Sequence, residues 1–508
     1  MGADVGVIQN GRSLGWITLG VSLFDITNRL RHEASIFPSV HITYSPSNPI
    51  HRPIIVELPD NGVRLRFDGP DQRLRLIEIL DFRKINLVYK GDQILKAGDS
   101  GALQHGKSGP LFRYVSKIFG PTPDGEYYKP AEVEDAERGL WIVSWPGIAF
   151  SFPYKHSAYK PDVSFNSLLS STATFPAVSM AIFEAQSWTK AQESLFDAMP
   201  SLPRSLNIAT KGRKRFPDEV ELAKIHPGGR IELVRRYGRP VWIILNETTQ
   251  QDLITDLGPP SSIYYKNDRR LSIHGHRHQR TSRRRNDLSP IRDDSTDTDD
   301  ASTYTVTDDS DIEGPNGKFS NMSRFEKEVA AAECFWNYSG HGFDVFISQP
   351  RTYRDPSDQR VTKVLFHGNV PGSYNFNQYR RSRWILEEIA DEEDELPLTS
   401  ELQWQDLSSR LKEHFKDTYA DEEEEASLQR GMVVNRGLDD SPGSSCEMLG
   451  GFEDDSDTGS VIRGRRKENE GLSHNREEEV MTDPELFGFP GLVFEVLKNG
   501  AVGCLTVF

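Results

Sequence analysis

The chain has few cysteines and no long apolar run. Only Cys334, Cys446 and Cys504 occur among 508 residues, and their spacing fits neither a metal site nor a disulfide framework. No apolar run reaches the roughly 20 residues that a membrane-spanning helix needs. The first residues lack the basic and apolar regions of a secretory signal. These absences predict a cytoplasmic protein without a membrane-spanning helix.

Acidic residues are concentrated in two stretches. The formal net charge is −16, of which residues 286–330 carry about −8 and residues 387–483 about −19, so the remainder carries about +11. Both stretches hold few apolar residues, and burial there would not offset the entropy lost on ordering. We expect solvated insertions in a basic folded protein, with Ser295, Thr296 and Thr298 as candidates for phosphorylation.

Between these stretches, short helical patterns alternate with runs of antiparallel strands. Leu23, Ile26 and Leu30 have the spacing of an amphipathic helix, and residues 54–58 and 63–67 are strand patterns joined by a turn. Such alternation favours separate helices and meanders over a parallel sheet. The sequence predicts an α+β fold with repeated units of a short helix plus an antiparallel β-meander and long disordered acidic insertions.

The expected organisation follows from these patterns. The last residues form an apolar hairpin that needs a sheet to join, so residues 387–483 are expected to be an insertion and not a tail. The expected segments are a first helix and β-meander unit at 12–92, a second β-rich unit at 110–208, a third helix and β-meander unit at 226–386 interrupted by disordered residues 280–328, the acidic disordered insertion at 387–483, and a C-terminal β-hairpin at 484–508 that rejoins the core.

Two motifs imitate sites of chemistry. Residues 101–108 fit the phosphate-loop pattern G-x-x-x-x-G-K-[ST], but Gly109 and Pro110 follow at once and disfavour the helix that such a loop opens. His274, His276 and His278 resemble a metal tract, yet three neighbouring histidines do not easily close a tetrahedral site. We expect no enzyme, no cofactor and no metal. A nucleotide-binding hydrolase using residues 101–108 is kept as an alternative.

Residues 361–384 combine a strand with an aromatic, amide-rich turn that ends in arginines. Gly368, Pro371 and Gly372 force turns after the strand. We call residues 368–383 the hook, and it is either a packed corner or a docking surface. Its candidate membrane-binding or partner-binding residues are Tyr374, Phe376, Tyr379, Arg380, Arg381 and Arg383.

The hook arginines allow four interpretations. They are a solvated surface, an intramolecular partner for the acidic linkers, a site for anionic phospholipid headgroups at about 1 kcal/mol per basic residue, or a nucleic-acid contact. No recognition helix, RNA-binding strand motif or zinc finger accompanies them, so no nucleic acid is expected as a partner. An arginine-mediated nucleic-acid-associated protein is kept as a second alternative.

The segment 361–384 resembles the phagosome assembly factor family. Further segments resemble it in family order at 12–23, 60–79, 256–274 and 487–508. This resemblance implies a non-catalytic autophagy factor that acts with a WD-repeat β-propeller partner, associates with phosphoinositide-containing membranes, and is recruited from the cytoplasm to the phagophore assembly site.

The acidic insertion contains one further candidate, Trp404-Gln405-Asp406-Leu407. A W-x-x-L pattern after acidic residues resembles the short linear motifs by which Trp404 and Leu407 would add a strand to a ubiquitin-like autophagy modifier. Alternatively, Leu402, Leu407 and Leu411 lie on one face of a short helix. Periodicity favours neither interpretation.

Overall fold

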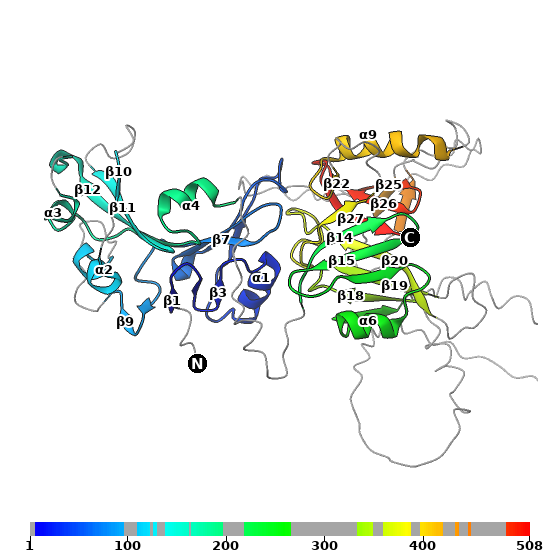
Figure 1. Ribbon diagram of the computed structural model, residues 1–508, viewed down its shortest axis with the longest axis horizontal. Helices are drawn as coiled ribbons and strands as arrows, with labels where there is room; N and C mark the ends of the chain where they lie inside the picture. Colours follow the sequence, from blue (N-terminus) through cyan, green and yellow to red (C-terminus); the bar gives the residue numbers. More distant parts are fainter. Residues whose placement is uncertain are drawn as a thin grey trace, which may run out of the picture.

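The protein consists of two lobes, each built around its own hydrophobic core (Figure 1). The computed structural model describes residues 6–95, 109–121, 125–129, 138–161, 164–196, 218–265, 333–348, 359–387, 397–419, 432–435, 445–448 and 484–508. The N-terminal lobe comprises the described residues up to 196, and the C-terminal lobe comprises those from 218 onward. Helices and antiparallel sheets occur in both, which confirms the predicted α+β class.

The N-terminal lobe is dominated by an eight-stranded sheet in the order β10-β11-β12-β13-β7-β6-β5-β4. Its strands are β4 (His41–Thr43), β5 (Ile54–Leu58), β6 (Val63–Phe67), β7 (Leu74–Ile79), β10 (Glu126–Tyr128), β11 (Arg138–Trp145), β12 (Ile148–Lys155) and β13 (Ser179–Ile182). Smaller sheets contain β1 (Ile8–Gln9), β2 (Ser13–Leu14) and β3 (Ile17–Thr18), and β8 (Val88–Tyr89) and β9 (Asp92–Gln93). The helices are α1 (Leu23–His32), α2 (Phe112–Phe119), α3 (Phe165–Leu169) and α4 (Trp188–Ser194).

The pairing of β13 with β7 makes one body of this lobe. Met180 lies opposite Ile79, and both side chains are buried in the same core. The segments 12–92 and 110–208, expected as separate units, therefore share one sheet. Their junction depends on a pairing of strands about a hundred residues apart, for which local patterns carry no signal.

The C-terminal lobe contains two sheets around one core. The five-stranded sheet has the order β16-β15-β14-β21-β22, and the nine-stranded sheet the order β17-β18-β19-β20-β27-β26-β25-β23-β24. The strands are β14 (Val220–His226), β15 (Arg230–Arg235), β16 (Val241–Ile244), β17 (Ser262–Tyr265), β18 (Cys334–Tyr338), β19 (Phe343–Ser348), β20 (Arg360–His367), β21 (Trp384–Leu386), β22 (Leu398–Thr399), β23 (Met432–Asn435), β24 (Ser445–Met448), β25 (Glu485–Phe489), β26 (Leu492–Val496) and β27 (Val502–Val507), and the helices are α6 (Gln250–Leu257) and α9 (Trp404–Phe415).

Strands distant in the chain meet inside this lobe. The C-terminal strand β27 pairs with β20, with Val507 opposite Val364, while β21 pairs in parallel with β14. Residues 397–419, inside the range expected to be disordered, form β22 and α9. Leu407 and Leu411 of α9 are fully buried in the core of the lobe. The expectation of disorder is wrong for these residues. It rested on the acidic composition of the whole stretch 387–483, whereas α9 within that stretch has a short apolar face that is buried.

Candidate functional site at the interface between the lobes

The hook leaves β20 and contacts the N-terminal lobe through amide side chains. The side chain of Gln72 donates from Nε2 to the carbonyl oxygen of Asn369 at 2.8 Å, and Asn369 Nδ2 donates to Gln72 Oε1 at 2.7 Å. Asn369 Oδ1 also accepts the backbone N–H of Asn377 at 2.7 Å. Both asparagines have positive φ, at 45° and 63°, which asparagine tolerates better than most residues. The amide-rich composition of the hook thus holds its turns and joins the two lobes.

Glu219 lies where arginines from both lobes converge. Its carboxylate is 2.6 Å from Arg73 of the N-terminal lobe, and 3.4 and 3.6 Å from Arg380 and Arg236. Burial raises the pKa of Glu219, but the arginines outweigh burial and lower it to about 2. Arg380 also pairs with Asp25 of α1 at 2.5 Å. Glu219 is therefore ionised at neutral pH and bridges the lobes.

A second set of contacts surrounds the loop at residues 68–72. Arg383 pairs with Asp71 of this loop and with Glu401, the latter at 2.7 Å. Arg381 donates to two backbone carbonyl oxygens, those of Pro70 and Gly368, each at 2.6 Å. Buried charges are stable only when paired and hydrogen-bonded, and each guanidinium group of the hook makes at least one contact of this kind across the interface. Two buried nitrogens, Arg380 Nε and Arg381 Nη2, have no hydrogen-bond partner among the described residues.

A small apolar cluster lies beside the polar contacts. Ile50 of the N-terminal lobe, Val370 of the hook and Ala501 before β27 are all buried together. Asn499, in the turn between β26 and β27, donates to the carbonyl oxygen of Pro46 at 3.1 Å. The C-terminal hairpin therefore contacts the N-terminal lobe as well as its own sheet.

These contacts contradict the expectation that the hook arginines form an exposed basic cluster. Arg380 and Arg381 are only 8% and 7% exposed, and Arg383 is partly exposed. Sequence inspection shows three clustered charges, but their partners Asp25, Asp71 and Glu219 are far away in the chain. In this structure the three arginines contact the N-terminal lobe, and Arg380 and Arg381 are turned away from solvent.

The aromatic side chains of the hook also include both packed and solvent-exposed residues. Phe376 packs against Tyr44 of the N-terminal lobe, with ring centroids 6.2 Å apart. Tyr379 stacks on His367 at 3.7 Å and donates from its hydroxyl group to Asp344 at 3.0 Å. Tyr374 is 47% exposed. Two of the three rings therefore belong to a packed corner, and Tyr374 is the ring that faces solvent.

A buried polar row that sequence reasoning missed crosses the nine-stranded sheet. Asn337, Asp344, His367 and Cys504 come from the adjacent strands β18, β19, β20 and β27. His367 Nε2 lies 3.0 Å from Asp344, and His367 is the register partner of Cys504. Burial lowers the pKa of His367, but Cys504 and Asp344 outweigh it and raise the pKa to about 10. The sequence signals are polar residues within mainly apolar strands, Asn337 in β18 and Asp344 in β19, together with a histidine at the end of β20 and a cysteine in β27.

Cysteine, histidine and aspartate in contact are a set that nucleophilic enzymes use. Here Tyr379 covers the imidazole, and the Cys504 thiol is buried. The arrangement fits a buried polar network that fixes Tyr379, and through it the hook, on the sheet.

Trp404 and Leu407 lie on α9, as in the helical alternative. Leu407 is fully buried, and the Trp404 ring lies 4.7 Å from Phe487 and 5.4 Å from Phe494. Addition of this segment as a strand to a ubiquitin-like modifier would require α9 to unfold and expose these contacts.

Other sequence candidates lie outside the described residues. These are the phosphate-loop pattern at 101–108, the histidines at 274–278, and Ser295, Thr296 and Thr298. Within the described residues, no group of three or more His, Cys, Asp or Glu side chains could hold a metal ion. No helix in that part of the chain is both long and apolar enough to cross a membrane.

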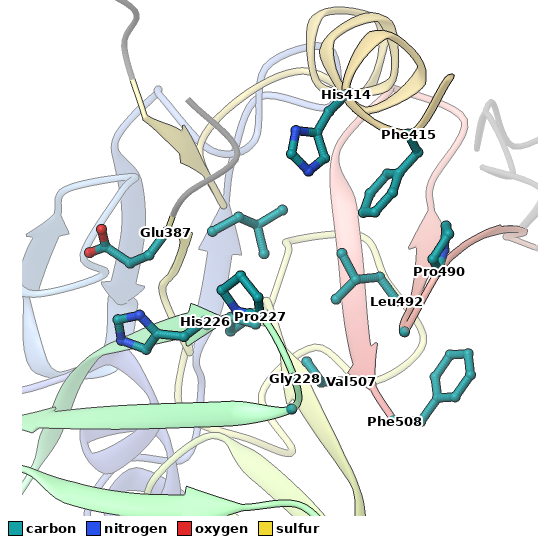
Figure 2. Close-up of a pocket in the computed structure, with 14 residues that line it drawn as sticks. His226, Pro227, Gly228, Glu387, His414, Phe415, Pro490, Leu492, Val507 and Phe508 are labelled. Atoms are coloured by element: carbon teal, nitrogen blue, oxygen red, sulfur yellow. The ribbon is translucent and has the colours of Figure 1, made fainter. Parts of the chain in front are cut away.

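A pocket of about 210 Å³ lies in the C-terminal lobe, and no residue of the hook lines it (Figure 2). Four segments meet around it: the β14–β15 turn, the end of β21, the end of α9 and the C-terminal hairpin. Its walls are mainly apolar, with His226, Glu387 and His414 as the polar lining residues. Figure 2 shows Phe415, Leu492 and Phe508 around the same space.

Comparison with known proteins places this arrangement in a family. The sequence model of the family described as phagosome assembly factor 1 matches residues 13–288 and 320–508. A PHAF1 protein of Arabidopsis thaliana is 23% identical over 398 residues, covering 77% of each chain. Those of Drosophila melanogaster and Caenorhabditis elegans are 26% and 23% identical over 376 and 387 residues, covering 72% of this chain each and 68% and 73% of the relatives. No solved structure matches the chain significantly.

The matched residues lie in both lobes and include the hook, its partners Asp25, Asp71 and Glu219, and Arg73, which pairs with Glu219. The match therefore extends over the whole interlobe site as well as over most of the chain, and the chain belongs to the phagosome assembly factor 1 (PHAF1) family.

Proposed function

We propose that this protein is a non-catalytic autophagy factor that acts from the cytoplasm at the phagophore assembly site, together with a WD-repeat β-propeller partner and phosphoinositide-containing membranes. Its family is named for phagosome assembly, which supports a role in that process. The finer assignment of partner, lipid and place rests on the resemblance of residues 361–384 and the segments around them.

The non-catalytic role in this proposal is supported by the pairing of the charged side chains between the lobes. Glu219 pairs with both Arg73 and Arg380, and Arg380 also pairs with Asp25 across the interface. A charged cluster poised for catalysis would instead aim unpaired groups at a substrate cleft. This interface holds two folded bodies in a fixed orientation, which is what a scaffold for other proteins requires.

The burial of the hook arginines also bears on how the protein reaches membranes. Headgroup attraction needs basic side chains at the surface, and Arg380 and Arg381 are paired and buried. We infer that phosphoinositide association goes through the propeller partner.

Affinity purification from starved cells tests the partner assignment. A WD-repeat β-propeller protein is expected to co-purify with the tagged chain, and the association between the two is expected to persist in the absence of lipid. Loss of the chain is expected to reduce the number of phagophore sites seen by fluorescence microscopy. Co-purification of metabolic enzymes without any propeller protein would contradict the proposal.

Vesicle flotation tests the membrane assignment. The purified chain alone is expected to stay with the soluble fraction when mixed with phosphatidylcholine vesicles containing phosphatidylinositol phosphates. Addition of the propeller is expected to carry the chain to the vesicle fraction. Vesicles without phosphoinositides are the control, and flotation of the chain by itself would show a direct lipid site.

The pH dependence of stability tests the ionised state of Glu219. Its pKa is lowered from 4.5 to about 2, so its contribution is present above pH 4.5 and is lost as the pH falls toward 2. The wild-type protein is therefore expected to lose up to about 3 kcal/mol more than Glu219→Gln over that range. Denaturant unfolding of both proteins at several pH values measures the difference. Parallel curves would show that Glu219 is not linked to folding.

A further inference from the structure

The interface between the two lobes is built mainly from polar and charged contacts. Each lobe has a large apolar core of its own, whereas the apolar cluster that the lobes share is small, with Ile50, Val370 and Ala501 as its buried members. A large apolar interface holds two domains together permanently, but a polar interface allows them to move relative to each other. The composition of this interface therefore favours lobes that can separate.

The buried hook arginines each contact both lobes. Arg380 pairs with Asp25 of the N-terminal lobe at 2.5 Å and with Glu219 of its own lobe at 3.4 Å. Arg381 donates to one backbone carbonyl oxygen in each lobe, both at 2.6 Å. If the N-terminal lobe moved away, each guanidinium group would keep one of its two partners.

The same duplication occurs on both sides of the contact between Arg383 and Asp71. Arg383 pairs with Glu401 of its own lobe at 2.7 Å, and Asp71 lies 3.3 Å from Arg75 of its own lobe. Removing one partner of a buried ion pair is costly because it leaves the other charge without compensation. Separation of the lobes avoids this cost, because the charged groups on each side have partners inside their own lobe.

The closed arrangement also leaves some polar groups of the interface unsatisfied. Arg380 Nε, Arg381 Nη2 and Asn377 Oδ1 are buried without a hydrogen-bond partner among the described residues. A buried polar atom that lacks a partner costs free energy, which hydration would recover. Gln72, whose amide group contacts the hook, has a φ of 50°, in a region that glutamine rarely adopts. These features lower the stability of the closed arrangement relative to one in which water reaches the interface.

We propose that the two lobes separate and re-associate while both remain folded, and that the arrangement described above is the closed state. Opening breaks the amide contacts between Gln72 and Asn369 and exposes the side chains of the hook that the closed state buries, Arg380 and Arg381 among them. Access to the hook is thereby controlled by the position of the N-terminal lobe. This inference goes beyond the proposed function and does not depend on it.

Thiol labelling of full-length chains under native conditions tests the proposal. All chains carry Cys446→Ser, so that Cys334 and Cys504, both buried in the C-terminal lobe, are the internal reference. Val370→Cys and, in a separate chain, Ile50→Cys introduce a thiol into the shared apolar cluster from either side. We expect a maleimide to label each introduced thiol at least about 100-fold faster than the reference thiols, because local opening requires less free energy than unfolding of a lobe.

A further substitution tests the contacts that keep the lobes closed. Gln72→Ala removes the paired hydrogen bonds to Asn369 and is expected to raise the labelling rate of both introduced thiols about 10-fold, without changing that of Cys504. Gln250→Ala is the matched control, because the side-chain amide of Gln250 donates to Gln359 within the C-terminal lobe. Its labelling rates are expected to equal those of the parent chain. The melting temperature of each variant reports on its fold.

Three outcomes would overturn the proposal. Labelling of the introduced thiols no faster than that of Cys334 and Cys504 would show that the lobes separate only when the protein unfolds. Rapid labelling at position 370 alone, with position 50 protected, would show that the hook frays while the lobes stay in contact. An equal increase at Cys504 in the Gln72→Ala chain would show that this substitution acts by unfolding the C-terminal lobe.

Discussion

Replacing Arg380 with glutamate is expected to destabilise the protein by about 3–5 kcal/mol, the cost typical of breaking a buried ion pair by removing one partner. The new carboxylate would lie beside those of Asp25 and Glu219, which Arg380 now neutralises. Equilibrium unfolding in urea measures the effect, and the midpoint of unfolding is expected to shift to a lower urea concentration.

Arg239→Glu provides the control for this charge reversal. Arg239 is exposed, and surface substitutions of this kind usually change stability by no more than about 0.5 kcal/mol. If Arg380→Glu unfolded at the same urea concentration as Arg239→Glu, the interlobe ion pairs would have no role in holding the fold.

Deleting residues 491–508 is expected to prevent the C-terminal lobe from folding. The deletion removes β26 and β27 from the nine-stranded sheet, together with the fully buried Phe494 and Leu505. A fully buried side chain of this kind contributes about 1.5–3 kcal/mol, and a folded domain has only about 5–15 kcal/mol in total. The truncated chain should be found in the insoluble fraction on expression.

A milder variant keeps this prediction measurable if the truncated chain cannot be purified. Phe494→Ala leaves the backbone of the sheet in place and is expected to cost about 3–5 kcal/mol. Phe508→Ala, at an exposed ring, is the control and should unfold like the wild type. A soluble truncated chain with an unchanged melting transition would show that β26 and β27 are dispensable.

Local structure could be predicted from the sequence wherever a short stretch of chain determines it. Helix α1 follows the apolar spacing of Leu23, Ile26 and Leu30, which are all buried, and it begins at Ser22, whose hydroxyl group accepts the N–H of Asp25. The turn before β6 closes with Gly62 at a φ of 65°, a conformation that glycine adopts without strain. In both cases the signal lies within a few residues.

The site could not be predicted in the same way, because its energetics depend on partners brought together by the fold. From the sequence, Arg380 looks like a surface charge, because its ion-pair partners Asp25 and Glu219 are distant in the chain and meet it only in the folded protein. His367 and Cys504 become neighbours only when β27 pairs with β20. Likewise, the parallel pairing of β14 with β21 joins strands far apart in the chain, and no local periodicity specifies which strands pair.

The position of β27 between β20 and β26 has a consequence for biosynthesis. Domains generally fold from the N-terminal side as the ribosome releases them, so the N-terminal lobe can form while the remainder is still being made. The nine-stranded sheet cannot form at that stage, because β20 lacks its partner strand β27 until residues 502–507 emerge from the ribosome. Nascent chains therefore expose an apolar strand edge from the release of β20 until residues 502–507 emerge, and chaperone demand should be concentrated on this last part of translation.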